Sequence, residues 1–173
     1  MPTPPLSPNW PIGVFDSGVG GLSILSALRA QLPNEDFLYL ADSAFAPYGE
    51  RDEPFVAQRA QAALQLLHQH HPIKALVVAC NTATALAIHL LRQQHPELPI
   101  FGVEPALKPA AIHSRTHRVG VIATAGTLGS QKFADLLNRL GTDTEFITQA
   151  CDGLAEAIEQ QWQHRHPSTC LLY

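Results

Sequence analysis

The sequence has few cysteines and no long apolar run. Its three cysteines, Cys80, Cys151 and Cys170, are odd in number and form no CxxC pair, which argues against a disulfide framework or a zinc knuckle. No segment approaches the ~18 uninterrupted apolar residues of a membrane-spanning helix, and the N-terminal residues lack the apolar core of a secretory signal. We therefore expect a cytoplasmic protein without a membrane partner.

Charged residues are scarce as well, at 15% of the chain, and the formal net charge is −4. Lysine and arginine are scattered without a basic run, which gives no reason to expect nucleic acid or an anionic membrane as a partner. Neither GxGxxG nor a GxxxxGK loop occurs, so no segment is typical of nucleotide binding. Hydrophobic residues, by contrast, make up 46% of 173 residues, enough for one domain or two small lobes.

Short apolar runs alternate with helical patterns along the chain, which is typical of a parallel α/β sheet. The runs predict strands at residues 12–15, 37–41, 76–79, 99–103, 118–123 and 144–149. Apolar residues at helical spacing predict helices after five of these strands, with buried faces at Leu22 to Leu28, Val56 to Leu67, Ala83 to Leu91, Phe133 to Leu140, and Leu154, Ile158 and Trp162. Gly141 is the expected stop of the fourth helix and Asp152 the expected cap of the fifth.

The start of this pattern repeats in the second half of the chain. Residues 12–18 align with residues 119–125 at an offset of 107, and each copy precedes a small-residue turn and a helix. This predicts two pseudo-symmetric lobes, at 11–105 and 106–160, with Ser17 and Thr124 as paired hydroxyls across a cleft. The counterpart of Cys80 would fall near position 187, so the second lobe is expected to be incomplete. Residues 1–10 are interpreted as a disordered Pro-rich segment and 161–173 as a ragged tail.

Cys80 follows the third predicted strand and precedes a helix, which places it at the carboxyl edge of the sheet, where doubly wound folds bind ligands. The helix N-terminus should lower the pKa of its thiol. Asn81 and Thr82 add short polar side chains that can cap the helix or bind a carboxylate or phosphate. Asp16 reaches the same edge from the first strand. The alternative is a plain buried cysteine with Thr82 as the helix cap.

Structural roles are also open for the other polar residues at this edge: Asp16, Ser17 and Thr124 as helix caps, Tyr48 and Gly49 as a turn, Asp42 as a loop residue and Cys151 as a structural thiol. His68, His70 and His71 invite a metal interpretation. They do not share one face of their predicted helix, however, so no metal site is expected.

Several short motifs occur together, in order and well spaced, and this combination is far more specific than any one motif. They are Asp16-Ser17-Gly18-Val19-Gly20-Gly21-Leu22, Pro47-Tyr48-Gly49, Ala79-Cys80-Asn81-Thr82-Ala83, Gly102-Val103-Glu104-Pro105 and Gly120-Val121-Ile122-Ala123-Thr124. Through these motifs the sequence, from about Pro11 to about Glu159, resembles the glutamate racemases.

The resemblance implies a cofactor-independent, two-base racemisation of free glutamate, which supplies the D-glutamate of peptidoglycan. Two cysteines on opposite sides of the substrate α-carbon remove and return its proton. By this resemblance Cys80 is the first base, Asp16 assists it, and Glu159 helps the histidine beside the second cysteine. The residues implied to hold the substrate are Asp16, Ser17, Tyr48, Gly49, Asn81, Thr82 and Thr124. The resemblance also makes a homodimer possible for full-length members of the family.

Family members continue with a second Cys-Thr-His motif, and this chain has none. Cys170, between Thr169 and Leu171, does not match it. The chain alone is therefore expected not to interconvert the enantiomers. Two other functions stay open: a non-catalytic module that binds a dicarboxylate, and a racemase of a related amino acid such as aspartate.

Overall fold

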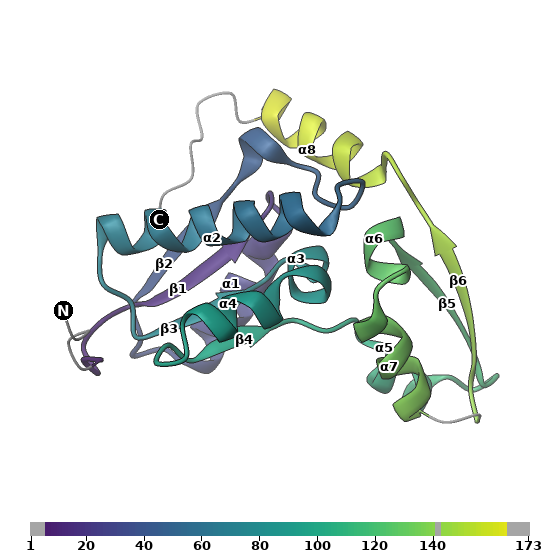
Figure 1. The fold of residues 1–173 in the computed structure, drawn as a ribbon. Coiled ribbons are helices and arrows are strands. Elements are labelled where there is room, and N and C mark those ends of the chain that lie inside the picture. The colour runs from purple at the N-terminus through teal and green to yellow at the C-terminus, as the bar shows by residue number, and fades with distance from the viewer. Residues whose placement is uncertain (1–5, 141–142, 166–173) are drawn as a thin grey trace.

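A four-stranded parallel sheet forms the first lobe (Figure 1). The computed structural model describes residues 6–140 and 143–165, so Gly141, Cys170 and the end of the expected tail lie outside the described residues. The strands β1 (Ile12–Asp16), β2 (Phe37–Ala41), β3 (Ala75–Val78) and β4 (Ile100–Gly102) lie in the order β2-β1-β3-β4. Because β1 and β3 pair with Phe15 opposite Val78, Asp16 and Cys80 reach the same edge, as predicted.

Helices cover both faces of this sheet. One face packs α1 (Gly21–Gln31) against Val14 and Tyr39. The other face carries α2 (Glu53–His70), α3 (Asn81–Leu86) and α4 (Ile88–Gln94), and the short η1 (Ser43–Phe45) lies in the loop before α2. The single helix expected after the third strand is two helices, because the backbone of Ala87 (φ −120°) departs from helical geometry.

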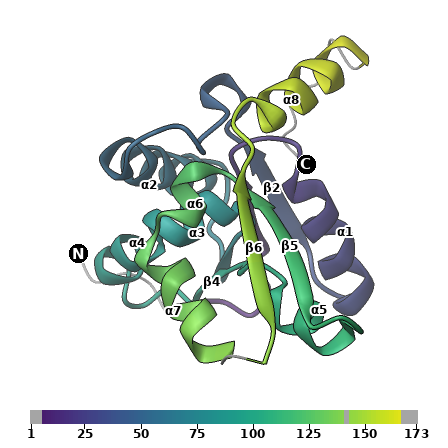
Figure 2. The same ribbon diagram turned by 90° about the vertical axis from the view of Figure 1, so that its right-hand side faces the viewer.

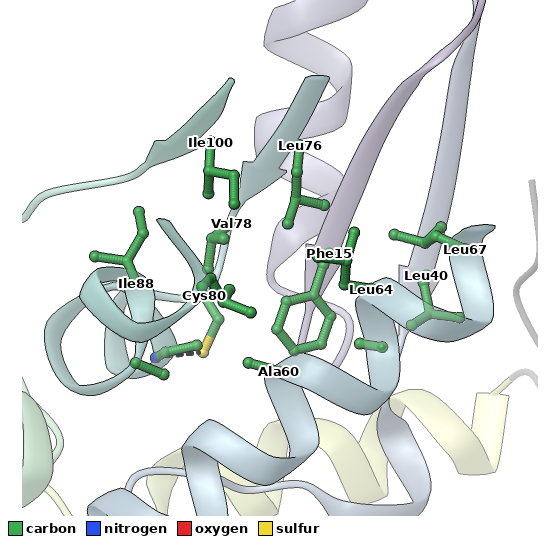
Figure 3. Packing of buried hydrophobic residues seen from close by; sticks show 14 of the residues in the cluster. Phe15, Leu40, Ala60, Leu64, Leu67, Leu76, Val78, Cys80, Ile88 and Ile100 are labelled. Atoms are coloured by element: carbon green, nitrogen blue, oxygen red, sulfur yellow. Dashed lines mark hydrogen bonds between the residues drawn. The ribbon is translucent and has the colours of Figure 1, made fainter. Parts of the chain in front are cut away.

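The larger core lies between the sheet and α2, α3 and α4. Leu76 and Val78 of β3 and Phe15 of β1 point towards Ala60 and Leu64 of α2 (Figure 3). Alternate residues of β1 and β3 face this side and the residues between them face the other core, so both faces are buried and the strands are continuous apolar runs. Cys80 belongs to this cluster, at its end next to α3. The sequence-based distinction between a site cysteine and a buried cysteine therefore does not hold, since Cys80 is both buried and at the sheet edge.

The second lobe repeats the start of the first. β5 (Arg118–Ala123) pairs in parallel with β6 (Glu145–Ala150), as β1 pairs with β2. α5 (Leu107–His113), α6 (Ala125–Leu128) and α7 (Gln131–Leu140) complete it, and the sequence had not predicted α5 and α6. Its core is small, with Leu107, Val121, Phe133 and Leu136 buried. Within the described residues the sheet has two strands, so this lobe is incomplete, as expected.

α8 (Leu154–Arg165) leads from β6 back to the first lobe (Figures 1 and 2). It includes residues 161–165, which the sequence assigned to the tail. The predicted buried face is wrong at two of its three residues, because Leu154 and Ile158 are 50% and 52% exposed, whereas Trp162 is half-buried. The helix instead turns Glu159 towards the first lobe, where its carboxylate accepts a backbone hydrogen bond. No helix within residues 6–140 and 143–165 has the length and apolarity to cross a membrane.

Candidate active site

A cavity of about 560 Å³ lies between the two lobes. Its walls come from the carboxyl ends of β1 and β3, the loop before α2, α5, and the strand β5 with the residue that follows it. All the substrate-binding residues expected from the sequence line this cavity, together with Cys80: Asp16, Ser17, Tyr48, Gly49, Asn81, Thr82 and Thr124. Glu159 and Cys151 are absent from the lining.

Cys80 is the N-cap residue of α3, with its side chain 6% exposed. Its Sγ accepts a hydrogen bond from the Ala83 N–H at 3.4 Å and lies 3.4 Å from the Ser17 Oγ. The expected lowering of its pKa is wrong. Burial raises the pKa of the thiol to about 11 and the charge of Asp16 adds to the rise, while the hydrogen bonds from Ser17 and Ala83 oppose it. The resting group at neutral pH is therefore the thiol.

Asp16 ends β1 beside Cys80, with 7% of its surface exposed. Its Oδ1 accepts the Gly18 N–H at 2.7 Å, which holds the loop after the strand, and the carboxyl also interacts with the Gly21 N–H at the start of α1. Burial raises the pKa of the carboxyl to about 6; the Gly18 hydrogen bond lowers it and the negative charge of Glu159 raises it. At pH 7 most of Asp16 is therefore ionised, and its carboxylate exchanges a proton readily with solvent near neutral pH.

Glu159 lies outside the cavity but touches the loop that positions Asp16 and Ser17. Its Oε1 accepts the Val19 N–H at 2.8 Å, across 140 residues of sequence. A side chain on Gly18 would collide with it, since a Cβ there would lie 1.9 Å from the same oxygen. The other carboxylate oxygen, Oε2, is buried and has no hydrogen-bond partner among the described residues. In this structure Glu159 therefore lies against the loop that follows β1, on the Cys80 side of the cavity.

The Tyr48–Gly49 segment joins the first lobe to the second. Tyr48 is 1% exposed, and its hydroxyl donates to the Asp42 Oδ2 at 2.5 Å. Gly49 accepts the Gly126 N–H at 3.2 Å, and a Cβ on Gly49 would lie 2.2 Å from the Thr124 Cγ2. Glycine at this position is therefore required by close packing between the lobes.

Three threonine hydroxyls meet where α3 faces α6. The Thr82 Oγ1 lies 3.1 Å from that of Thr124 and 3.3 Å from that of Thr127. Thr124 is the N-cap of α6, accepting the Thr127 N–H at 3.3 Å, so the capping role that the sequence left open as an alternative is present. Thr82 does not cap α3, because Cys80 occupies that position. Asn81 is exposed at the cavity wall.

Sequence reasoning missed two parts of the site. Asp42, interpreted as a loop residue, forms an ion pair with Arg59 and accepts the Tyr48 hydroxyl. The strand β5 lines the cavity from Val119 to Ala123, a role that its alignment with the first strand could have suggested. No group of histidine, cysteine and carboxylate side chains suited to a metal ion occurs in the described part of the chain.

Comparison with known proteins agrees with this arrangement. Residues 12–169 match the family model of Asp/Glu/hydantoin racemases. The chain belongs to this family. Among the relatives, the glutamate racemase of Stutzerimonas stutzeri is 54% identical over 149 residues, which are 86% of this chain and 56% of that protein. The glutamate racemase of Cupriavidus pinatubonensis is 59% identical over 151 residues, 87% of this chain and 54% of that protein.

Solved structures of the racemase family share the fold. The Bacillus anthracis glutamate racemase isoform RacE1 is 36% identical with a TM-score of 0.77, and the match covers 92% of this chain and 59% of that one. The Escherichia coli glutamate racemase, solved with L-glutamate and the activator UDP-MurNAc-Ala, is 34% identical with a TM-score of 0.79 and the same coverage. The chain thus spans little more than half the length of the relatives it matches.

Proposed function

We propose that this chain carries the Cys80 half of a glutamate racemase site. The proposed reaction is the cofactor-independent interconversion of L- and D-glutamate, in the cytoplasm, for peptidoglycan synthesis. One observation carries the proposal: a thiol beside Asp16 and Ser17 opens on a cavity lined by both lobes, in a chain 54–59% identical to proteins named glutamate racemase. The names of these relatives favour glutamate over aspartate.

The chemistry requires a strong base next to the substrate α-carbon. An α-proton beside a carboxylate is weakly acidic, so the base must be strong and well placed, and the developing negative charge must meet preorganised donors. The thiolate of Cys80, which lines the cavity, is the base that we assign. Because the pKa of the Cys80 thiol is raised to about 11, its proton has to leave as the reaction proceeds. We assign that proton to the Asp16 carboxylate, an uphill transfer because the pKa of Asp16 is only about 6, so the thiolate forms transiently. The Cys80 thiolate then removes the α-proton and becomes a thiol again, and Asp16 releases its proton to solvent. Ser17 and Asn81 at the cavity wall supply polar groups towards the carbanion.

Inversion also needs an acid on the opposite face of the α-carbon. Cys80 is the thiol that lines the cavity, and Cys151 does not line it. The described residues therefore supply one of the two bases, and we expect this chain to exchange the α-proton of one enantiomer without inverting it. A second candidate, binding of a dicarboxylate without catalysis, differs only in lacking this exchange.

Proton exchange in heavy water tests the proposal. L-glutamate, D-glutamate and both aspartate enantiomers are incubated with the chain, and loss of the α-proton signal is followed by NMR, with calorimetry for binding. We expect binding of glutamate and Cys80-dependent exchange of one glutamate enantiomer, absent in Cys80→Ala. Binding without exchange favours the dicarboxylate module. Absence of glutamate binding would overturn the proposal, and equal turnover of both enantiomers would overturn the one-base view.

A further inference from the structure

We propose that Asp42 and Arg59 are positioning residues of the cavity: they engage the Tyr48 hydroxyl and fix the Tyr48–Gly49 segment as one cavity wall. Neither Asp42 nor Arg59 lines the cavity, whereas Tyr48 and Gly49 do. The part of the proposal that concerns substrate rests on the proposed function. The part that concerns the loop does not.

The ion pair has the geometry of a fixed clamp. Arg59 on α2 donates from Nε to the Asp42 Oδ2 at 2.8 Å and from Nη2 to Oδ1 at 2.7 Å. Such a two-point contact fixes direction as well as distance. The side chains of Arg59 and Asp42 are 22% and 12% exposed, and the guanidinium lies 3.6 Å from the centroid of the Phe45 ring. Asp42, which precedes η1, and Phe45, its last residue, are thus both in contact with Arg59 of α2.

Tyr48 links this clamp to the cavity. A tyrosine hydroxyl has one proton to donate, and that of Tyr48 is given to Asp42. It is therefore not free to donate to an anionic group in the cavity. The ring packs against Phe15 and Phe55, with centroid distances of 6.2 and 6.3 Å, and the next residue, Gly49, meets the second lobe. We infer that Tyr48 contributes the shape of the wall, and that Asp42 and Arg59 determine this shape.

The three partners can be removed one at a time with different consequences. Arg59→Met leaves the poorly exposed Asp42 carboxylate without its cation, and Asp42→Ala removes the acceptor of both partners. Tyr48→Phe keeps the ion pair and the ring packing and removes a single hydrogen bond. Arg59→Lys keeps the charge but not the two-point contact, so it should rescue only part of the effect.

Lys74→Met is a matched control. Lys74 forms an ion pair with Glu35, the two side chains being 19% and 34% exposed, and neither residue lines the cavity. Loss of this pair removes a comparable interaction from the first lobe at a distance from the proposed site. If breaking any ion pair in this lobe weakened glutamate binding or sped up cleavage, Lys74→Met would therefore show the same change.

Glutamate binding, measured by calorimetry well below each variant's melting temperature, is the first readout. We expect Arg59→Met and Asp42→Ala to raise the Kd at least tenfold, Arg59→Lys and Tyr48→Phe to raise it less, and Lys74→Met to leave it within twofold. If Tyr48→Phe is the most damaging change while Arg59→Met binds like the unaltered chain, the hydroxyl contacts substrate directly and the proposal is wrong.

Native-state trypsin cleavage after Arg51, which is exposed in the same loop, is the second readout and needs no ligand. Mass spectrometry of the fragments should show cleavage at least tenfold faster in Arg59→Met and Asp42→Ala, with Lys74→Met unchanged. If the unaltered chain fails to bind glutamate, the proposed function fails while this readout still decides the clamp. Cleavage of folded Arg59→Met at the unaltered rate would overturn it.

Discussion

Burial raises the pKa of both Cys80, which lies in the core next to α2 and α3, and Asp16, which lies against Gly21 at the start of α1. The pKa of Cys80 is raised to about 11 and that of Asp16 to about 6. At neutral pH the Cys80 thiol is protonated and can donate a proton, and the Asp16 carboxylate is mostly ionised and can accept one. The two groups also repel when both are ionised, which keeps one proton between them at physiological pH.

Alkylation of Cys80 should show this directly. The thiolate is the reactive form, so a pKa near 11 instead of 9 lowers the rate with iodoacetamide about 100-fold at pH 8, and the rate should rise about tenfold per pH unit up to pH 10. Asp16→Asn removes a charge that opposes the thiolate and should speed the reaction several-fold. Peptide mass spectrometry measures the rate, with Cys151 as the internal reference. A Cys80 that reacts at pH 7 like a small free thiol would contradict this account.

Asp16 should also make the protein less stable above its pKa. The folded-state pKa, about 6, lies above the value of 3.8 for an unperturbed aspartate, so the folded chain holds the proton more tightly. Its stabilising contribution is complete below about pH 4 and is lost as the pH rises through 6, by about 3 kcal/mol. Asp16→Asn stays neutral and keeps an acceptor for the Gly18 N–H.

Urea unfolding at pH 4, 5, 6 and 7 measures this contribution. The variant should be more stable than the unaltered chain at pH 7 by up to about 3 kcal/mol, and the difference should shrink towards pH 4. A difference that does not vary with pH would mean that Asp16 has the same pKa in the folded and unfolded chain.

At the scale of the element, strands were more predictable than helices. The strands β2 and β5 lie where the apolar runs placed them, because a buried parallel strand is a continuous apolar run whatever its neighbours are. Two apolar residues of α8, Leu154 and Ile158, were wrongly predicted as buried, because this helix contacts the first lobe through the Glu159 carboxylate, a partner that periodicity does not reveal. The pKa of Cys80 escaped prediction for the same reason: α2, distant in sequence, buries it.

The contact between α8 and the loop after β1 can be tested by a double-mutant cycle. Gly18→Ala places a methyl group where the Glu159 carboxylate lies, and Glu159→Ala removes that carboxylate and its hydrogen bond to Val19. Each change should cost about 1–3 kcal/mol of unfolding free energy, since a hydrogen bond to a charged group is lost in both. Together they should cost little more than Glu159→Ala alone, because the colliding atoms are already gone.

Gly20→Ala is the control, since a Cβ there meets no atom within 4 Å. Its unfolding free energy should stay within about 0.5 kcal/mol of the unaltered chain, as for a surface substitution. Additive costs of Gly18→Ala and Glu159→Ala would show that α8 does not rest on this loop in solution.

At the scale of the whole molecule, the two lobes follow one plan to different extents. In the first lobe, residues 12–15 of β1 pair with β3, which carries Cys80 beyond its end. The repeat aligns residues 12–15 of β1 with residues 119–122 of β5, at an offset of 107. The edge of β5 that faces away from β6 corresponds to the edge of β1 that pairs with β3, and it has no partner strand among the described residues. Residues 119–122 line the cavity. A strand added here would end beside Thr124, as β3 ends beside Ser17, and would bring its following residue to the cavity across from Cys80.

The relatives contain additional chain, since the match covers 54–56% of their length. This chain spans 54% of the Cupriavidus pinatubonensis relative, so we expect the remainder of that protein, co-expressed as a separate polypeptide, to associate with it. Loss of the circular dichroism signal of each glutamate enantiomer, and loss of its α-proton signal in NMR, should then show racemisation of both enantiomers. The chain alone should give no racemisation. The same remainder with the Cys80→Ala chain should associate equally well and stay inactive, which separates assembly from chemistry. If the two polypeptides do not copurify, the expectation fails.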